Sequence, residues 1–282
     1  MRSVLITGTS SGFGLASAVE LARRGWQVVA TMRDLAKRAR LDDAAKQAGV
    51  SARLSLVRLD VTDAPSLAGA VAEVLAQTNG QLDAVVHNAG VAVGGAFEEL
   101  PEAELRRVME TNFFGVLGLT RALLPTFRAQ RGGRILVVSS NSAYAGEPAN
   151  SIYVASKWAV EGWAESIAFE LGPFGIDVVL VEPGAYRTEI WDSSPRILPA
   201  GSPYWTWLKT FERTVDERVV AQARDPQEVA RTIATALDAR RPRFRYPVGP
   251  DAWLGFILRG ILPARLRRAA ITRYLSLPTT PG

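Results

Sequence analysis

Short apolar runs alternate along this chain with longer segments of helical apolar spacing, and this alternation constrains the fold most. The runs cover residues 4–6, 26–31, 53–59, 82–86, 134–140 and 176–181. Helical spacing marks residues 15–22, 35–48, 64–78, 101–128 and 152–172. Parallel strands joined by helices are covered on both faces. The chain is therefore expected to form an α/β fold, a doubly wound parallel sheet of Rossmann type with helices on both faces, in a single domain.

Composition argues against several kinds of site. The 282 residues include no cysteine and one histidine, His87. Disulfides, thiolate metal sites and a Ser-His-Asp triad are therefore not expected, no metal is expected, and His87 is interpreted as structural. The N-terminus lacks the features of a signal peptide, and no apolar run approaches the ~20 residues that span a bilayer. We therefore expect a cytoplasmic location.

The positive charge of the chain is concentrated at its C-terminal end. The net charge is +5, but residues 240–282 hold nine arginines and one acid, a net +8, which leaves −3 for the rest. The basic character therefore belongs to the tail, and nucleic acid is not an expected partner.

The first apolar run ends in a glycine turn, Gly8-x3-Gly12-x-Gly14, that leads into a helical segment. Glycines let the backbone turn tightly and approach a ligand, and a helix N-terminus attracts a pyrophosphate. The spacing differs from G-x-G-x-x-G but serves the same purpose. The turn therefore predicts a dinucleotide site.

Other polar or turn residues also follow strand ends. Ligands of parallel sheets bind beyond the carboxyl ends of the strands, so residues scattered along the sequence converge there. The residues at such ends are Thr7, Asp60, Asn88, Ser140 and Pro183.

A tyrosine and a lysine, Tyr153 and Lys157, lie four residues apart at the head of an expected helix. Residues i and i+4 share a helix face. A nearby cation lowers the pKa of a phenol, so the pair is a candidate proton donor and acceptor for a carbonyl or an alcohol. The alternative is a surface lysine above a half-buried tyrosine.

With these motifs in order, the sequence resembles the short-chain dehydrogenase/reductase family over roughly residues 3–190. The sequence around residues 30–34 and 155–162 is most similar to the sequences of hydroxysteroid and retinol dehydrogenases. The motifs that carry the resemblance are Thr7-Gly8…Gly12-x-Gly14, Asp60, Asn88-Ala89-Gly90, Asn112, Ser140, Tyr153-x-x-x-Lys157 and Pro183-Gly184 with Thr188.

The resemblance implies a catalytic set of Asn112, Ser140, Tyr153 and Lys157. Tyr153 is expected to be the general acid, Lys157 to lower its pKa and hold the nicotinamide ribose, and Ser140 to donate a hydrogen bond to the substrate oxygen. Asn112 is expected to anchor a water that joins Lys157 to solvent, or to bond a backbone carbonyl at a helix kink. The residues expected to bind cofactor are Gly8, Ser10, Ser11, Gly12, Phe13, Gly14, Arg33, Asp60, Val61, Asn88, Ala89, Gly90, Tyr153, Lys157, Pro183, Gly184 and Thr188.

Two of these cofactor-binding expectations have structural alternatives. Asp60 is expected to bind the adenine amino group, and otherwise caps a helix. Asn88 and Gly90 are expected to line the adenosine side, and otherwise only terminate a strand.

The end of the second strand favours NADP(H) over NAD(H). An enzyme that uses NAD usually carries an acid at this position, where this chain has Met32 followed by Arg33. An arginine suits a 2′-phosphate, and Ser10 could donate to the same group. The alternative is that Arg33 is a solvated side chain neutralised by Asp34.

The chain after Pro183-Gly184 is expected to select the substrate. Tyr186, Trp191, Tyr204, Trp205, Trp207 and Phe211 indicate an aromatic lid, at about residues 186–222, over a hydrophobic substrate. The alternative is that these rings only pack the lid onto the body. Residues 226–239 are expected to form one more helix, and residues 244–248 an edge strand.

The basic tail gives the chain an expected division into residues 1–249, the catalytic domain with its lid, and residues 250–282, a basic and apolar extension. Residues 250–277 combine apolar and arginine side chains, which fits peripheral contact with a membrane surface. The alternatives are packing beside the substrate pocket or a subunit contact. The family resemblance implies a homo-oligomer, a dimer or a tetramer.

The expected function is hydride transfer between NADP(H) and a hydrophobic secondary alcohol or ketone, such as a steroid-, retinoid- or lipid-like carbonyl. One alternative is a reductase of a polar or acyl-carrier-bound ketone on the same scaffold. A second alternative is a non-catalytic NADP(H)-binding regulatory or interaction protein.

Overall fold

The structure is a computed structural model that describes residues 1–275 and residue 277. For Trp191 and Asp192 it describes the backbone alone. Residue 276 and residues 278–282 of the expected C-terminal extension, and the side chain of the expected lid residue Trp191, therefore lie outside the described part.

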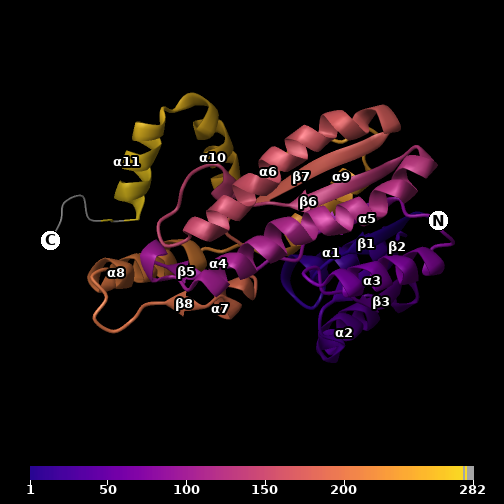
Figure 1. The fold of residues 1–282 in the computed structure, drawn as a ribbon, viewed down its shortest axis with the longest axis horizontal. Coiled ribbons are helices and arrows are strands. Elements are labelled where there is room, and N and C mark those ends of the chain that lie inside the picture. The colour runs from indigo at the N-terminus through magenta and orange to yellow at the C-terminus, as the bar shows by residue number, and fades with distance from the viewer. Residues whose placement is uncertain (276, 278–282) are drawn as a thin grey trace.

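A seven-stranded sheet, parallel throughout, forms the centre of the molecule (Figure 1). Its strand order, β3-β2-β1-β4-β6-β7-β9, confirms the doubly wound fold. The strands are β1 (Ser3–Ile6), β2 (Gln27–Met32), β3 (Leu54–Arg58), β4 (Ala84–His87), β6 (Gly133–Val138), β7 (Ile176–Pro183) and β9 (Arg245–Val248). The strand expected at 244–248 is β9, and it forms the edge beside β7.

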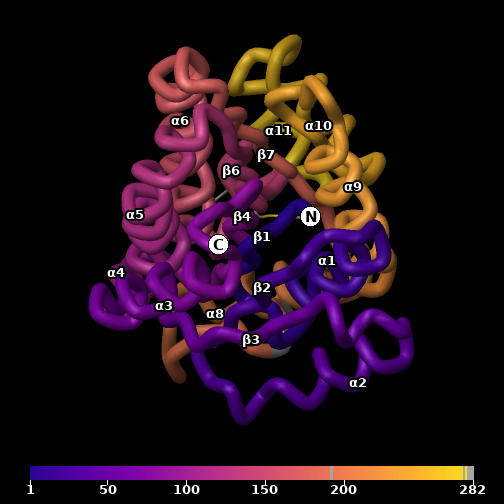
Figure 2. The backbone as a smooth tube through the Cα atoms, turned by 90° about the vertical axis from the view of Figure 1, so that its right-hand side faces the viewer, coloured from indigo at the N-terminus to yellow at the C-terminus, as the bar shows by residue number. Residues whose placement is uncertain are grey.

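Helices cover both faces of the sheet, with α1 and α9 on one side and α3, α5 and α6 on the other (Figure 2). The helices are α1 (Gly12–Arg23), α2 (Ala39–Gln47), α3 (Ala64–Gln77), α4 (Glu102–Met109), α5 (Gly115–Gln130), α6 (Ser151–Leu171), α7 (Ile190–Ser193), α8 (Trp205–Val215), α9 (Gln227–Asp238), α10 (Pro250–Ile261) and α11 (Ala264–Tyr274).

The strand sequences are apolar on both faces because both faces are buried. Val4 and Ile6 of β1 pack under α1 and α9, whereas Leu5 between them packs on the opposite side. Successive strand side chains point to opposite faces of a sheet, so an uninterrupted aliphatic run is needed here.

The helix expected over residues 101–128 is divided by a π-helical turn at Glu110–Phe114. Asn112 lies in this turn, and its side chain bonds both the N–H and the carbonyl of Val91, each at 2.9 Å. A π turn inserts one residue into a helix, and such turns are frequent at functional sites. The wider turn places Asn112 beside the loop that follows β4.

A second, two-stranded sheet was not expected from the sequence. It pairs β5 (Gly94–Gly95) with β8 (Arg196–Ile197) and joins the loop after β4 to the segment that follows β7. Strands of two residues, one of them Gly-Gly, carry no period-2 pattern, so the sequence gives no signal for them.

The order of the strands reverses between β1 and β4. The loops after these two strands lead in opposite directions and leave a crevice at their carboxyl ends, where doubly wound folds bind ligands. The residues after β1, β4, β6 and β7 all line one cavity at this end of the sheet.

Candidate active site

The glycine turn after β1 depends on glycine at three positions. Gly8 and Gly12 have φ of +72° and +52°, in the left-handed region. Gly14 has no space for a side chain, since a Cβ there would lie 2.2 Å from the carbonyl oxygen of Gly8. The turn is therefore packed directly against the first turn of α1.

Gly14→Ala is expected to destabilise the protein by about 1–3 kcal/mol through overpacking and to weaken dinucleotide binding. The new methyl would meet backbone, which cannot give way as a flexible side chain can. Urea unfolding and titration with NADPH, followed by fluorescence, measure the two effects. Gly69→Ala in α3 is the matched control, because a Cβ there meets nothing within 4 Å. Equal stability of the two variants would contradict this packing.

Thr7 and Asn88 hold the glycine turn against the end of β4. The Thr7 hydroxyl accepts hydrogen bonds from the N–H groups of Asn88 and Ala89, both at 2.9 Å. The Asn88 amide donates to the carbonyls of Thr7 (2.9 Å) and Gly8 (3.0 Å). Asn88 therefore shapes the turn as well as lining the cavity, which is more than strand termination.

The N-terminus of α1 provides an anion site. Leu15 N–H donates to the Ser11 carbonyl, so the N–H groups of Gly12, Phe13 and Gly14 precede the helical ladder. In the described part of the chain, the Ser11 side chain does not cap this turn, and the first turn holds no acid. Free N–H groups and the helix dipole suit a pyrophosphate, so this turn fits a dinucleotide.

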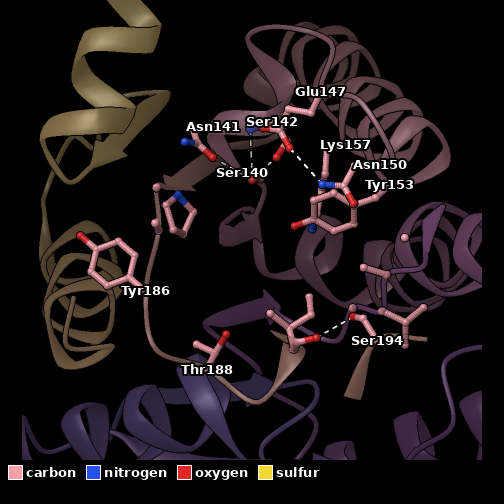
Figure 3. A pocket seen from close by; sticks show the side chains of 18 of the residues that line it. Ser140, Asn141, Ser142, Glu147, Asn150, Tyr153, Lys157, Tyr186, Thr188 and Ser194 are labelled. Carbon is pink, nitrogen blue, oxygen red and sulfur yellow. Dashed lines mark hydrogen bonds between the residues drawn. The ribbon is translucent and has the colours of Figure 1, made fainter. Parts of the chain in front are cut away.

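Three of the expected catalytic side chains meet on one side of the cavity (Figure 3). Tyr153 and Lys157 extend from α6, and Ser140 follows β6. The Lys157 ammonium lies 5.6 Å from the centre of the Tyr153 ring and donates to the Val138 carbonyl at 2.9 Å. Ser140 accepts from the Ser142 N–H at 3.1 Å, which fixes its position. Thr188 lies across the pocket from them (Figure 3).

Burial dominates the pKa of Tyr153 in this structure, and the expected lowering of that pKa by Lys157 stays a prediction. Burial raises the pKa of Tyr153 to about 12, a hydrogen bond with Ser140 opposes this shift, and the charge of Glu147 adds to it. Burial also lowers the pKa of Lys157 to about 8, against the charge of Glu161. Desolvation disfavours the charged forms of both groups. This direction of the pKa shift favours the protonated form of Tyr153 at neutral pH.

Asn112 is buried behind this group and does not line the cavity. Its amide also donates to the Ser156 hydroxyl at 3.0 Å. A Cβ placed on Gly90 would lie 3.5 Å from the Asn112 amide oxygen and 4.0 Å from the Lys157 ammonium. The missing side chain of Gly90 leaves a gap between the two groups. The backbone-bonding role is present, and the water-anchoring role stays a prediction.

The alternative role of Asp60, as a helix cap, is wrong. Asp63 caps α3, accepting from the Ser66 N–H at 2.9 Å. Asp60 instead accepts from the N–H (3.0 Å) and hydroxyl (2.8 Å) of Thr62. This local turn holds its carboxylate at the cavity rim, where adenine binding stays a prediction.

His87 is 3% exposed, and its Nε2 lies 2.9 Å from the Thr120 hydroxyl. Burial lowers its pKa to about 3. A neutral, buried and hydrogen-bonded imidazole agrees with a structural role.

One cavity of about 1580 Å³ collects nearly all the expected site residues. Drug-sized ligands occupy roughly 300–1,000 Å³, so this volume can hold a dinucleotide and a substrate together. Of the expected residues, Gly14 and Asn112 alone do not line it, because both lie one layer behind the surface.

Two basic residues at this cavity were not expected from the sequence. Lys37 and Arg40 line its rim beside Arg33, and Arg40 pairs with Glu189 at 2.7 Å. They lie in a polar segment after β2, where charged residues usually face solvent, so no sequence pattern distinguishes them from surface residues.

The segment of the expected lid lines the cavity, and two of its five described aromatic side chains, Tyr186 and Phe211, do so. Of the four rings in residues 204–211, Phe211 alone lines it, whereas Trp207 stacks edge-on with Tyr204 and Phe211. Tyr186 is 1% exposed, packs on Phe13 and donates to Glu228 at 2.9 Å. Tyr204 and Trp207 pack within the segment, so the expected aromatic wall is present only in part.

The one acid of the C-terminal extension is bound to the active-site loop. Asp251 accepts from the Ala185 N–H at 2.8 Å. A Cβ on Gly184 would lie 2.0 Å from the same carboxylate. Only glycine at position 184 leaves room for the Asp251 carboxylate to come this close to the backbone. The hydrogen bond to Ala185 then attaches α10 to the loop that follows β7.

The fold and the site together define a class. A doubly wound parallel sheet, an anion-binding glycine turn at its switch point, and a tyrosine and lysine facing that turn are the parts of a dinucleotide-dependent oxidoreductase.

Comparison with known proteins identifies the family. A family model described as short chain dehydrogenase matches residues 2–196. The uncharacterized oxidoreductase YusZ of Bacillus subtilis is 40% identical over 267 residues, 93% of this chain and 94% of YusZ. The 17-beta-hydroxysteroid dehydrogenase type 1 of Homo sapiens is 37% identical, over 86% of this chain and 76% of its own. The chain belongs to the short-chain dehydrogenase family, and its likeness to hydroxysteroid dehydrogenases is confirmed.

Solved structures agree with the fold. A short-chain dehydrogenase from Streptomyces avermitilis superposes with a TM-score of 0.79 at 35% identity, covering 98% of this chain and 96% of its own. An alcohol dehydrogenase from Thermococcus sibiricus (TM-score 0.69, 26% identity, 87% and 95% covered) was solved with 5-hydroxy-NADP. A short-chain dehydrogenase/reductase from Burkholderia phymatum, solved with NAD, superposes with a TM-score of 0.77 at 25% identity, covering 99% of this chain and 96% of its own. The fit of a nicotinamide dinucleotide is therefore supported, without a choice between the two.

Proposed function

We propose that this protein is an NADP(H)-dependent oxidoreductase that interconverts a hydrophobic secondary alcohol and its ketone. The observation that carries the proposal is the convergence of Ser140, Tyr153 and Lys157 on a cavity that also contains the glycine turn. The bound nicotinamide would supply or accept the hydride.

The side chains of this chain would handle the proton and the developing charge. Tyr153 would give its hydroxyl proton to the carbonyl oxygen, to which Ser140 would donate a hydrogen bond. Lys157 would then stabilise the resulting phenolate, since an adjacent cation favours the charged form. The gap between Asn112 and Lys157 beside Gly90 gives room for a water that returns the proton.

The surroundings of β2 favour the phosphate-bearing cofactor. Met32 ends the strand and is 3% exposed, and Arg33 and Lys37 then line the rim. Asp34 accepts from the Ala36 N–H at 3.0 Å, so its carboxylate caps a local turn. Two cations without a carboxylate at the strand end suit a 2′-phosphate better than two ribose hydroxyls.

The substrate end of the cavity supports an apolar ligand. Its walls include Leu208 and Phe211 of α8 and Leu258 of α10, with Leu262 beyond it. Burying apolar area of a substrate against these side chains contributes roughly 25 cal/mol per Å².

The cofactor preference is tested by kcat/KM with NADPH and NADH over a panel of ketones, steroids and retinoids. We expect NADPH to be preferred, and Arg33→Ala to lower kcat/KM for NADPH by about 10-fold or more, as loss of a charge-assisted bond does. The value for NADH should change little. Arg23→Ala, at the far end of α1, is the control. A wild-type preference for NADH would overturn the assignment.

The homo-oligomer stays a prediction. Phe169 of α6 is 80% exposed, and Phe114, in the π-helical turn before α5, is 50% exposed, so these two rings offer apolar contact surface to a second subunit. Sedimentation velocity across a concentration series tests it, and a monomer throughout would contradict it.

A further inference from the structure

One face of α10 exposes a stripe of apolar side chains, which we name the apolar stripe. Its members are Trp253, Leu254, Ile257 and Ile261, exposed by 45%, 58%, 48% and 72%. Residues at these spacings share one side of a helix. On the opposite side, Ala252 is fully buried and Gly255 approaches the Tyr144 ring so closely that a Cβ would lie 3.0 Å from it. The stripe is therefore the outer face of a helix whose inner face is packed.

The helix that follows adds positive charge beside this stripe. Arg265, Arg268 and Arg273 of α11 are exposed. The sequence holds no aspartate or glutamate after Asp251, and Asp251 itself is bound to the Ala185 N–H. These arginines therefore have no acid within their own segment.

The two helices are held together as a hairpin that stands out from the sheet (Figure 1). The Arg267 guanidinium donates to the carbonyls of Arg259 (3.1 Å) and Leu262 (2.7 Å), which fixes the corner between them. Arg218 donates to the Tyr274 carbonyl at 2.6 Å and fastens the end of α11 to the segment after α8. The hairpin is therefore a fixed part of the structure.

The same hairpin forms a wall of the cavity. Leu258, Leu262 and Ile271 line the cavity, as does Leu254 of the apolar stripe, whereas Trp253, Ile257 and Ile261 do not line it. One layer of helix thus separates the substrate end of the cavity from the exposed apolar face. A hydrophobic substrate concentrates in lipid. A lipid-binding surface next to the cavity would therefore shorten the path of the substrate from the lipid to the cavity.

We propose that the α10–α11 hairpin docks on an anionic lipid surface, with the apolar stripe among the acyl chains and the arginines at the phosphates. Its link to substrate delivery rests on the proposed function, whereas the docking itself does not. Charge complementarity favours lipid over a second copy of this hairpin. A two-fold contact would place like patches against one another, and residues 250–282 of each copy hold five arginines and one acid, a net charge of +4. An anionic leaflet attracts such a segment instead.

Vesicle co-sedimentation of the full-length protein tests the docking. We expect binding to phosphatidylcholine vesicles that contain about 30% of the anionic lipid phosphatidylserine, and much weaker binding to pure phosphatidylcholine. Ile257→Ser with Ile261→Ser should lower the partition coefficient by at least about 10-fold. Arg265→Glu with Arg268→Glu should remove the preference for anionic vesicles. Phe97→Ser, at a 64% exposed ring outside the hairpin, is the matched control and should bind as wild type does.

Several results would overturn the proposal. These are equal sedimentation with and without vesicles, or an equal loss in Phe97→Ser. A dimer that the Ile257/Ile261 variant abolishes, in a protein that binds no lipid, would assign the stripe to a second copy. NADPH binding by each variant, measured by fluorescence, confirms that it is folded. Vesicle co-sedimentation does not require enzyme turnover. The docking proposal can therefore be tested even if the proposed enzyme activity is not found.

Discussion

Replacing Tyr153 with phenylalanine is expected to lower kcat for ketone reduction by about 10²–10⁴-fold, the range that a positioned general acid contributes. The phenyl ring keeps the packing on α6 but has no proton to give. The hydroxyl it lacks is the one that burial keeps protonated, with a pKa raised to about 12, and that hydrogen-bonds Ser140. Steady-state kinetics with saturating NADPH measure the effect.

NADPH affinity, measured by fluorescence titration, separates chemistry from folding in this variant. We expect it to change far less than kcat, because the glycine turn and Arg33 are untouched. Tyr204→Phe, in a ring that does not line the cavity, is the matched control and should keep full turnover. A Tyr153→Phe protein that binds NADPH and turns over as wild type would exclude this mechanism. A wild type that binds NADPH but reduces no ketone would favour the non-catalytic alternative.

Replacing Arg245 with methionine is expected to cost about 3–5 kcal/mol of unfolding free energy, as does removing the cation from a buried ion pair. Arg245 lies at the start of β9, and its Nη1 contacts the carboxylates of Glu161 and, at 2.6 Å, Glu182. The Glu182 side chain is 0% exposed and that of Glu161 4%. Without the guanidinium, the two buried carboxylates would lose the cation that contacts both of them.

Urea unfolding measures this loss, and Arg106→Met provides the control. Arg106 pairs with Glu102 at 2.6 Å on an exposed helix face, where such pairs contribute about 0.3–0.5 kcal/mol. Changing Glu161 and Glu182 to glutamine in the Arg245→Met protein should restore part of the stability. Equal losses for Arg245→Met and Arg106→Met would contradict the account.

The same cluster predicts a pH dependence of stability. Burial, reinforced by the charge of Glu161, raises the pKa of Glu182 from 4.5 to about 7. The folded protein then keeps a proton that the unfolded chain releases, so this contribution is full below about pH 4.5 and lost as pH rises through 7. The penalty of Arg245→Met should accordingly be smaller at pH 5 than at pH 8.

The sequence predicted the frame of the site because its signals are local. Each strand run, the glycine turn and the Tyr153–Lys157 spacing lie within a few residues, and strand direction then brings the strand ends together. The expected residues therefore meet in one cavity. The family resemblance supplied their roles.

Distant contacts explain what the sequence missed or misassigned. The carboxylate of Asp251 reaches Ala185, 66 residues earlier, and neither residue carries a pattern that points to the other. The sequence allows Asp60 as a helix cap, but the first hydrogen-bonded turn of α3 uses Asp63 instead. The lid aromatics have the composition of a pocket wall, but their packing directs most of them toward one another.

The sequence by itself determined the alternation of strands and helices, the glycine turn and the residue types of the candidate active site. These follow from steric and periodic rules that act between near neighbours. The tertiary structure alone decided the directions in which burial shifts the pKa values of Tyr153 and Lys157, the partners of Glu182, and which face of α10 is exposed. Desolvation and charge pairing depend on everything within several ångströms, and burial by segments far apart in the chain sets both.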